Sequence, residues 1–188
     1  MDKRTWIQYR HSFARYGEGT LQRRITTYNI QMTIWANGAI ACFRLSPQDY
    51  HRYHSPVSGV VTWFKSLGGE YYGVDPLAVC SSLDVLAKND RACIEITTQE
   101  FGRVLFVAIG AEDVGKIQIN DKFKREGSHV EKGDEVGLFE FGGSSIIIVF
   151  EAGRIQWDED LKLWSNRRIM VDVEVGMSIG RATMPRKV

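Results

Sequence analysis

The sequence predicts a mainly β domain with one or two short helices. Short runs of β-branched and aromatic residues recur along the chain, and turn residues separate them, as in all-β proteins. The clearest helix signature begins at Asp75 and Pro76, with Asp as the N-cap and Pro at the first position. The run 146–150 is short, apolar and largely β-branched, which indicates a strand buried on both faces.

Length and composition indicate one ordinary globular domain. With 188 residues the chain is long enough for a substantial core, and its net charge of +1 gives no reason to expect a nucleic-acid partner. Its three cysteines lack CxxC spacing, so we expect reduced thiols rather than a disulfide framework. We find no signal peptide and no apolar run of the roughly 18 residues that a membrane span needs. We therefore expect an intracellular protein, in solution or peripheral on a membrane.

The first half of the chain becomes readable only after residue 35. Residues 1–35 show no sustained helical or strand period and form a poorly defined N-terminal segment before a β domain at 36–188. Residues 39–45 form the first clear strand, after an Asn-Gly turn. Two prolines bound the segment 47–56, which predicts a loop or a single turn. Strand character returns at 57–65.

The second half alternates strands and turns. The helix that starts at Asp75 is expected to end by residue 90 and to bury Leu77. Strands follow at 92–97, 103–109, 116–119 and 136–141. The Val-x-x-Gly-Asp-x-Val pattern at 130–136 resembles the hairpins of lipoyl and biotinyl barrels, which makes the predicted fold barrel-sandwich-like. No lysine stands at the tip of such a hairpin, so we expect no covalent lipoyl or biotin group. A polar loop or short helix at 157–168 and a half-buried strand at 171–176 complete the chain.

The stretch 139–150 has two interpretations. Gly142 and Gly143 separate two apolar strands, so the structural interpretation is a hairpin with a glycine turn. The chemical interpretation is self-cleavage, because Ser144 follows a glycine that leaves room beside its carbonyl group. Attack of the Ser144 Oγ on the Gly143 carbonyl carbon would give an ester. β-Elimination would then cut the chain and leave a residue that hydrolyses to a pyruvoyl group.

His51 and His54 stand three residues apart in the proline-bounded segment. In a turn the two imidazoles can face one site, whereas in a strand they would point to opposite sides. Three roles are open for them. The pair could begin a zinc site, although zinc needs a third or fourth ligand and we expect no metal. It could be structural, or each histidine could act as a separate acid or base near neutral pH.

Several separated motifs agree with one known family. They are the segments 37–45 and 47–56, Phe101-Gly102, Gly110-Ala111 with Val114-Gly115, 132–135 and 141–145. Together they resemble the phosphatidylserine decarboxylase family, in the family's order, from about residue 36 to residue 181. The Gly-Gly-Ser-Ser form is most similar to fungal and other eukaryotic members. Motifs that agree over so much of the chain are far more specific than a single Gly-Gly-Ser-Ser.

The resemblance implies a pyruvoyl-dependent decarboxylase that forms phosphatidylethanolamine and CO2 from phosphatidylserine. Cleavage between Gly143 and Ser144 would give chains 1–143 and 144–188, with Ser144 as the precursor of the covalent pyruvoyl cofactor. By family analogy His54 is the base for self-cleavage and His51 serves the decarboxylation, while Ser145 and Gly142 support the site. The resemblance also allows peripheral contact with a membrane and a homodimer, besides the pairing of the two cleaved chains.

The sequence departs from the family in two ways. The family's self-cleavage triad includes an aspartate from an upstream segment, but only Asp2 and Glu18 are acidic before Asp49. The family also has a longer N-terminal region, so we expect this sequence to be the C-terminal portion of such an enzyme and to cut itself slowly. Two alternatives follow. One is a pyruvoyl-dependent decarboxylase of a free aromatic amino acid, and the other is a truncated, unprocessed β domain without activity.

Overall fold

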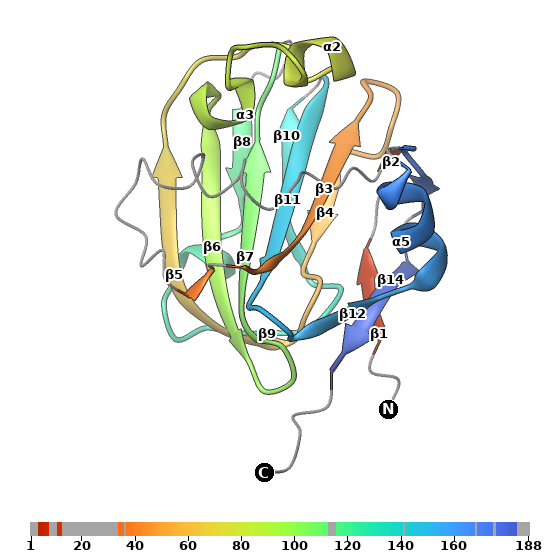
Figure 1. The fold of residues 1–188 in the computed structure, drawn as a ribbon. Helices are drawn as coiled ribbons and strands as arrows, with labels where there is room; N and C mark the ends of the chain where they lie inside the picture. The colour runs from red at the N-terminus through yellow and green to blue at the C-terminus, as the bar shows by residue number, and fades with distance from the viewer. Residues whose placement is uncertain are drawn as a thin grey trace.

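The computed structural model describes residues 4–7, 11–12, 34–35, 37–112, 116–140, 142–167, 169–174 and 176–183. In these residues the fold is mainly β, which confirms the predicted class. Its centre is a six-stranded antiparallel sheet, seen face-on in Figure 1. In sheet order the strands are β3 (Ala39–Leu45), β11 (Ser144–Phe150), β7 (Gly102–Ile109), β6 (Arg91–Thr98), β5 (Gly59–Leu67) and β9 (His129–Val130).

Strand β11 lies between β3 and β7 and is buried along its whole length. Ile146 and Ile148 belong to the core on one face of the sheet, while Ile147 and Val149 belong to the core on the other. The prediction of a strand buried on both faces is therefore confirmed. This burial explains why the run contains no polar residue after Ser145.

A second, smaller sheet covers one face of the first. It consists of β4 (Arg52–His54), β10 (Glu135–Glu140) and β8 (Lys116–Ile119), and α4 (Asp121–Lys124) follows β8. Tyr53, Phe123 and Phe139 share one buried cluster with Phe106 of the larger sheet. Since each fully buried phenylalanine contributes about 1.5–3 kcal/mol, this cluster holds the two sheets together.

Two single-turn helices cover the opposite face, where one longer helix was predicted. They are α2 (Pro76–Val79) and α3 (Val85–Lys88). Asp75 caps α2 as predicted, but the Ser81 hydroxyl donates to the Ala78 carbonyl and competes with the next helical turn. Asp84 then starts α3 by accepting from the Ala87 N–H. The predicted burial of Leu77 is wrong, since it is 85% exposed.

The two ends of the described chain meet beside the main core. One small sheet has β14 (Met177–Ala182) in the middle, flanked by β1 (Arg4–Ile7) and β12 (Ile155–Trp157). A second has two strands, β2 (His11–Ser12) and β13 (Asp172–Val173). The helix α5 (Glu159–Asn166) lies nearby. Figure 1 shows this group at the right of the large sheet. Part of the undefined N-terminal segment thus forms strands. The helix within 157–168 is confirmed, whereas the strand predicted at 171–176 is reduced to the two residues of β13.

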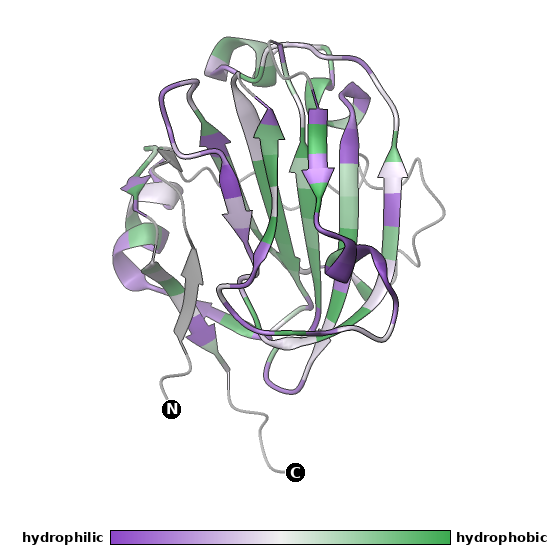
Figure 2. Cartoon of the chain, turned by 180° about the vertical axis from the view of Figure 1, so that it is seen from behind, coloured by the Kyte–Doolittle hydropathy of each residue, from purple (hydrophilic) through white to green (hydrophobic). Residues whose placement is uncertain are grey.

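Hydropathy follows this layering. Figure 2 shows mostly hydrophobic strands in the middle of the molecule and hydrophilic segments at its edges. The predicted turn at 131–134 is present, but its flanking strands β9 and β10 pair with different partners. None of the helices in the described part of the chain has the length and apolar character that a membrane crossing requires.

Candidate active site

Ser144 is the first residue of β11 and lies at the end of the six-stranded sheet, opposite Leu45. Because side chains alternate along a strand, Ser144 faces the same core as Ile146 and Ile148. Its side chain is fully buried, and its hydroxyl has no hydrogen-bond partner in the described part of the chain. A buried, unpaired hydroxyl costs about 1–3 kcal/mol, so this position lowers the stability of the fold.

Gly142 and Gly143 carry the chain from β10 in the smaller sheet to β11 in the larger one. The hairpin interpretation is therefore wrong, because β10 and β11 do not pair with each other in either sheet. Gly142 is buried and has a φ of 113°, a conformation that favours glycine. A Cβ added at Gly143 would lie 3.7 Å from the Leu45 carbonyl oxygen, which is an ordinary contact. The conformational need for glycine thus falls on Gly142.

His51 contacts this crossing directly. Its carbonyl oxygen accepts a 3.0 Å hydrogen bond from the Phe139 N–H, which fixes its backbone beside β10. Its Nε2 lies 2.5 Å from the Gly142 carbonyl oxygen, and its Nδ1 lies 2.6 Å from the Asp49 carbonyl oxygen. A carbonyl oxygen only accepts, and only the doubly protonated imidazolium donates at both nitrogens. Both ring nitrogens of His51 therefore face carbonyl acceptors.

His54 has a different pair of partners. Its Nδ1 lies 2.8 Å from the Gly133 carbonyl oxygen, and its Nε2 lies 3.1 Å from the Tyr50 hydroxyl. The carbonyl requires a proton on Nδ1, whereas the hydroxyl can donate to a lone pair on Nε2. The Tyr50 and His54 rings also stack, with centroids 6.0 Å apart. In this arrangement Nδ1 can donate to the Gly133 carbonyl while Nε2 accepts from the Tyr50 hydroxyl.

The turn at 131–134 positions the Gly133 carbonyl. Gly133 donates to the Ser55 carbonyl, and Ser55 donates to the Asp134 carbonyl, both at 2.8 Å. Gly133 itself has a φ of 93°. The Asp134 carboxylate accepts from the Glu131 N–H and from Lys122, and these bonds hold the pKa of Asp134 below its ordinary value. A Gly-Asp turn that sequence reasoning treated only as a motif thus orients His54.

Of the two histidines only His54 lies on a strand, within a segment that was predicted as a loop or a single turn. His54 ends β4, and His51 immediately precedes it. Between them Tyr53 is fully buried and donates to the Gln118 carbonyl at 2.6 Å, and burial strongly raises its pKa. This anchor fixes the backbone of both histidines. Neither ring is hydrogen-bonded to the Ser144 hydroxyl in the described part of the chain, and the ring of His51 contacts the crossing before that serine.

Ser145 points away from Ser144. It pairs with Arg44 of β3 and Ile109 of β7, and the alternation along β11 places all three on the face covered by α2 and α3. Ser145 is 2% exposed. Within the described part of the chain, no cluster of three or more histidine, cysteine or acidic side chains has a geometry that suits a metal ion.

Comparison with known proteins agrees with the sequence motifs. The model of the phosphatidylserine decarboxylase family matches residues 15–181. Phosphatidylserine decarboxylase proenzyme 2 of Komagataella phaffii is 49% identical over 142 residues, which are 76% of this chain and 14% of that protein. Proenzyme 2 of Oryza sativa is 48% identical over 80% of this chain and 24% of its own length. The proenzyme of Chlamydia trachomatis is 37% identical over 78% of this chain and 48% of its own length. The chain thus spans at most about half the length of these relatives.

Proposed function

The chain belongs to the phosphatidylserine decarboxylase family, and we propose that it cuts itself between Gly143 and Ser144 and converts phosphatidylserine to phosphatidylethanolamine and CO2. The observation that carries this proposal is the Ser144 hydroxyl, which is buried without a partner in the described residues, directly after the Gly142 crossing. The names of the relatives favour the lipid over a free aromatic amino acid as substrate. A lipid substrate also supports peripheral contact with a membrane, and the homodimer stays a prediction.

Self-cleavage begins with proton transfer from Ser144 to His54. We assign the role of base to His54 by family analogy; in the structure its Nε2 contacts the Tyr50 hydroxyl, on a side chain that is 46% exposed, and so must be released before it can accept the Ser144 proton. The Oγ then bonds to the Gly143 carbonyl carbon, and the peptide C–N bond breaks as its nitrogen takes up a proton. Loss of the Ser144 Cα proton next breaks the Cβ–Oγ bond and releases the Gly143 carboxylate. Hydrolysis of the remaining residue releases ammonia and leaves the pyruvoyl group.

The negative charge that develops on the Gly143 carbonyl oxygen needs hydrogen-bond donors. The Ser145 hydroxyl faces the other side of the sheet from Ser144, so we assign this role to backbone N–H groups near Ser144. His51 holds the adjacent Gly142 carbonyl and so limits the freedom of the crossing.

The site of Ser144 fits the pyruvoyl group. Conversion replaces the CH2OH side chain with a methyl group, which removes the unpaired hydroxyl from an apolar core. When formed, the group supplies a ketone that binds the substrate amine and accepts the electrons left by the departing CO2. His51, whose ring nitrogens both face acceptors, is the proton donor that we propose for the substrate carbon.

Intact mass measurement tests the proposal. We expect two chains, 1–143 and 144–188, with the smaller one beginning in a pyruvoyl group. Hydride reduction in the presence of short-chain phosphatidylserine should add the mass of the lipid to the smaller chain. Trapping of tryptophan in place of the lipid would support the amino-acid decarboxylase. A chain that stays at 188 residues after long incubation would support an unprocessed β domain.

A further inference from the structure

Arg44 stands beside the cleavage site on β3. It pairs directly with Ser145, the residue after the proposed pyruvoyl precursor, and paired residues in adjacent strands have Cβ atoms about 5 Å apart. The two side chains lie on the same face of the sheet. The position of Arg44 therefore follows from strand register, although 101 residues separate it from Ser145 in the sequence.

The Arg44 side chain extends toward the end of the sheet where the chain is cut. Its Nη1 lies 3.4 Å from the Oγ of Ser46, which is two residues farther along in the direction of that end. Leu45 pairs with Ser144, and a Cβ added at Gly143 would lie 3.7 Å from the Leu45 carbonyl oxygen. The guanidinium group thus lies near the level of the Gly143–Ser144 bond along the strand, on the face of the sheet opposite to the Ser144 side chain.

The guanidinium of Arg44 lacks the partners that such a group requires. Its Nε is buried and has no hydrogen-bond partner in the described part of the chain, and the bond to Ser46 is long. Arg91, in the same row of the sheet, instead donates to the carbonyls of Leu86 and Ala87. A buried cationic nitrogen without an acceptor is costly, which indicates a ligand that supplies one.

We propose that Arg44 binds the phosphodiester of the lipid headgroup while the headgroup amine occupies the site of residue 144. This inference rests on the proposed function. A guanidinium presents a planar fork of donors that matches two phosphate oxygens. The substrate carboxylate is a poorer partner, because an arginine bound to it would stabilise the charge that must be lost as CO2 leaves. In the substrate, only the serine Cβ and one ester oxygen separate the reacting carbon from the phosphorus.

Two substrates distinguish phosphate binding from carboxylate binding. Short-chain phosphatidylserine carries both anions, whereas an O-alkyl serine carries only the carboxylate. We expect Arg44→Met to lower kcat/KM for phosphatidylserine by roughly 10- to 100-fold, chiefly through KM, as for the loss of a charged hydrogen bond. The value for the O-alkyl serine should stay unchanged, and Arg44→Lys should lie between. Arg103→Met is the control, since Arg103 pairs with Glu151 at the opposite end of the same sheet.

Binding to the uncut chain tests the inference without catalysis. In a Ser144→Ala background residue 144 still fills the site of the amine, so the probe is the phosphodiester glycerophosphoglycerol. Calorimetry should show an affinity about 10- to 100-fold weaker when Arg44→Met is added, and no change with Arg103→Met. Equal losses of activity on both substrates would assign Arg44 to the carboxylate and overturn the proposal, as would unchanged binding. Failure of the wild-type chain to cut itself would overturn the proposed function alone, because the binding measurement does not depend on cleavage.

Discussion

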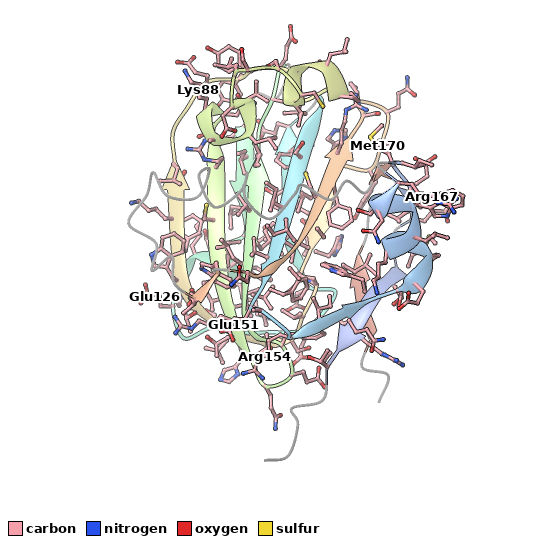
Figure 3. All side chains as sticks on the ribbon, in the orientation of Figure 1. Lys88, Glu126, Glu151, Arg154, Arg167 and Met170 are labelled. Atoms are coloured by element: carbon pink, nitrogen blue, oxygen red, sulfur yellow. The ribbon has the colours of Figure 1, made fainter. Side chains whose placement is uncertain are left out.

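At one end of the six-stranded sheet the Glu151 carboxylate has hydrogen-bond partners, whereas at the other end two buried polar groups have none in the described residues. At one end the Glu151 carboxylate accepts from the Arg103 N–H at 3.0 Å and lies 3.5 Å from the Arg154 Nε. Figure 3 labels Glu151 and Arg154 close together at this end. At the other end the Ser144 Oγ and the Arg44 Nε are both buried without partners in the described residues. After these groups alone, we call the Glu151 end of the sheet the satisfied end and the Ser144 end the unsatisfied end; the unsatisfied end carries the Gly-Gly-Ser-Ser crossing.

We relate this difference to two separate properties of the protein, its stability and its chemistry. Buried polar groups in folded proteins are normally hydrogen-bonded, so two unpaired groups on adjacent strands need an explanation. Sites that bind or transform a ligand commonly keep such groups at a cost in stability. We therefore expect changes at the unsatisfied end to alter chemistry first, and changes at the satisfied end to alter the free energy of unfolding.

Ser144→Ala should have the largest effect. It removes the proposed nucleophile, so no two-chain product should form. It also removes a buried hydroxyl without a partner in the described residues, so the free energy of unfolding should rise by up to about 1–3 kcal/mol. Intact mass and urea unfolding measure the two effects. Ser165→Ala is the matched control, because the Ser165 hydroxyl on α5 is also buried and unpaired in the described residues. The control should gain stability and still cut itself. A cut Ser144→Ala chain would remove Ser144 from the mechanism.

The two histidines should separate by role. His54→Ala removes the proposed base and its Nε2 atom and should slow chain cleavage by about 10⁴-fold. His51→Ala should still produce two chains but lose about 10²- to 10⁴-fold in decarboxylation, as expected for a missing proton donor. A gel time course and a CO2-release assay measure the two rates. His129→Ala, an exposed position on β9, is the control and should change neither rate. Identical behaviour of the His51 and His54 variants would contradict the two hydrogen-bond patterns.

Glu151→Ala should affect stability alone. The substitution removes the acceptor of the Arg103 N–H and the partner of Arg154, and we expect the free energy of unfolding to fall by about 1–2 kcal/mol. Chain cleavage, measured by intact mass at a temperature well below unfolding, should proceed at the wild-type rate. A slower cleavage in a fully folded Glu151→Ala protein would show that the two ends of the sheet are coupled.

Acidification should have the smallest effect, through the turn that holds His54. The Glu131 N–H and Lys122 lower the folded-state pKa of Asp134, so its stabilising contribution is complete above the ordinary carboxyl pKa of about 3.9. The contribution is lost as the pH falls below that value through the lower folded-state pKa. Because solvent reaches the Asp134 carboxylate and screens its charge, we expect less than about 1 kcal/mol. Urea unfolding at pH 5 and pH 3 should show that Asp134→Asn lowers stability less at pH 3. An equal loss at both pH values would exclude this linkage.

Much of the fold and the family could be predicted from local patterns. The strand β3 and the two-sided burial of β11 follow from runs of apolar residues, because burial on each face demands an apolar side chain at each position. The separated motifs identify the family, and the proposal that the chain is cut between Gly143 and Ser144 follows from the chemistry of a serine after a glycine. The break between α2 and α3 was missed because the Ser81 hydroxyl binds a backbone carbonyl that any residue could supply.

Only the tertiary structure decided which groups meet. A period of two predicts a strand but not its partner, so the sequence could not show that β10 and β11 belong to different sheets. His51 contacts the backbone carbonyl of Gly142, and His54 contacts that of Gly133. Every residue has a backbone carbonyl, so the residue type does not reveal which carbonyl accepts a hydrogen bond. Arg44 meets Ser145 through strand register, across 101 residues of chain. Residue types determined the available chemistry, and long-range pairing determined its geometry, because contacts between distant residues exist only once the sheets have formed.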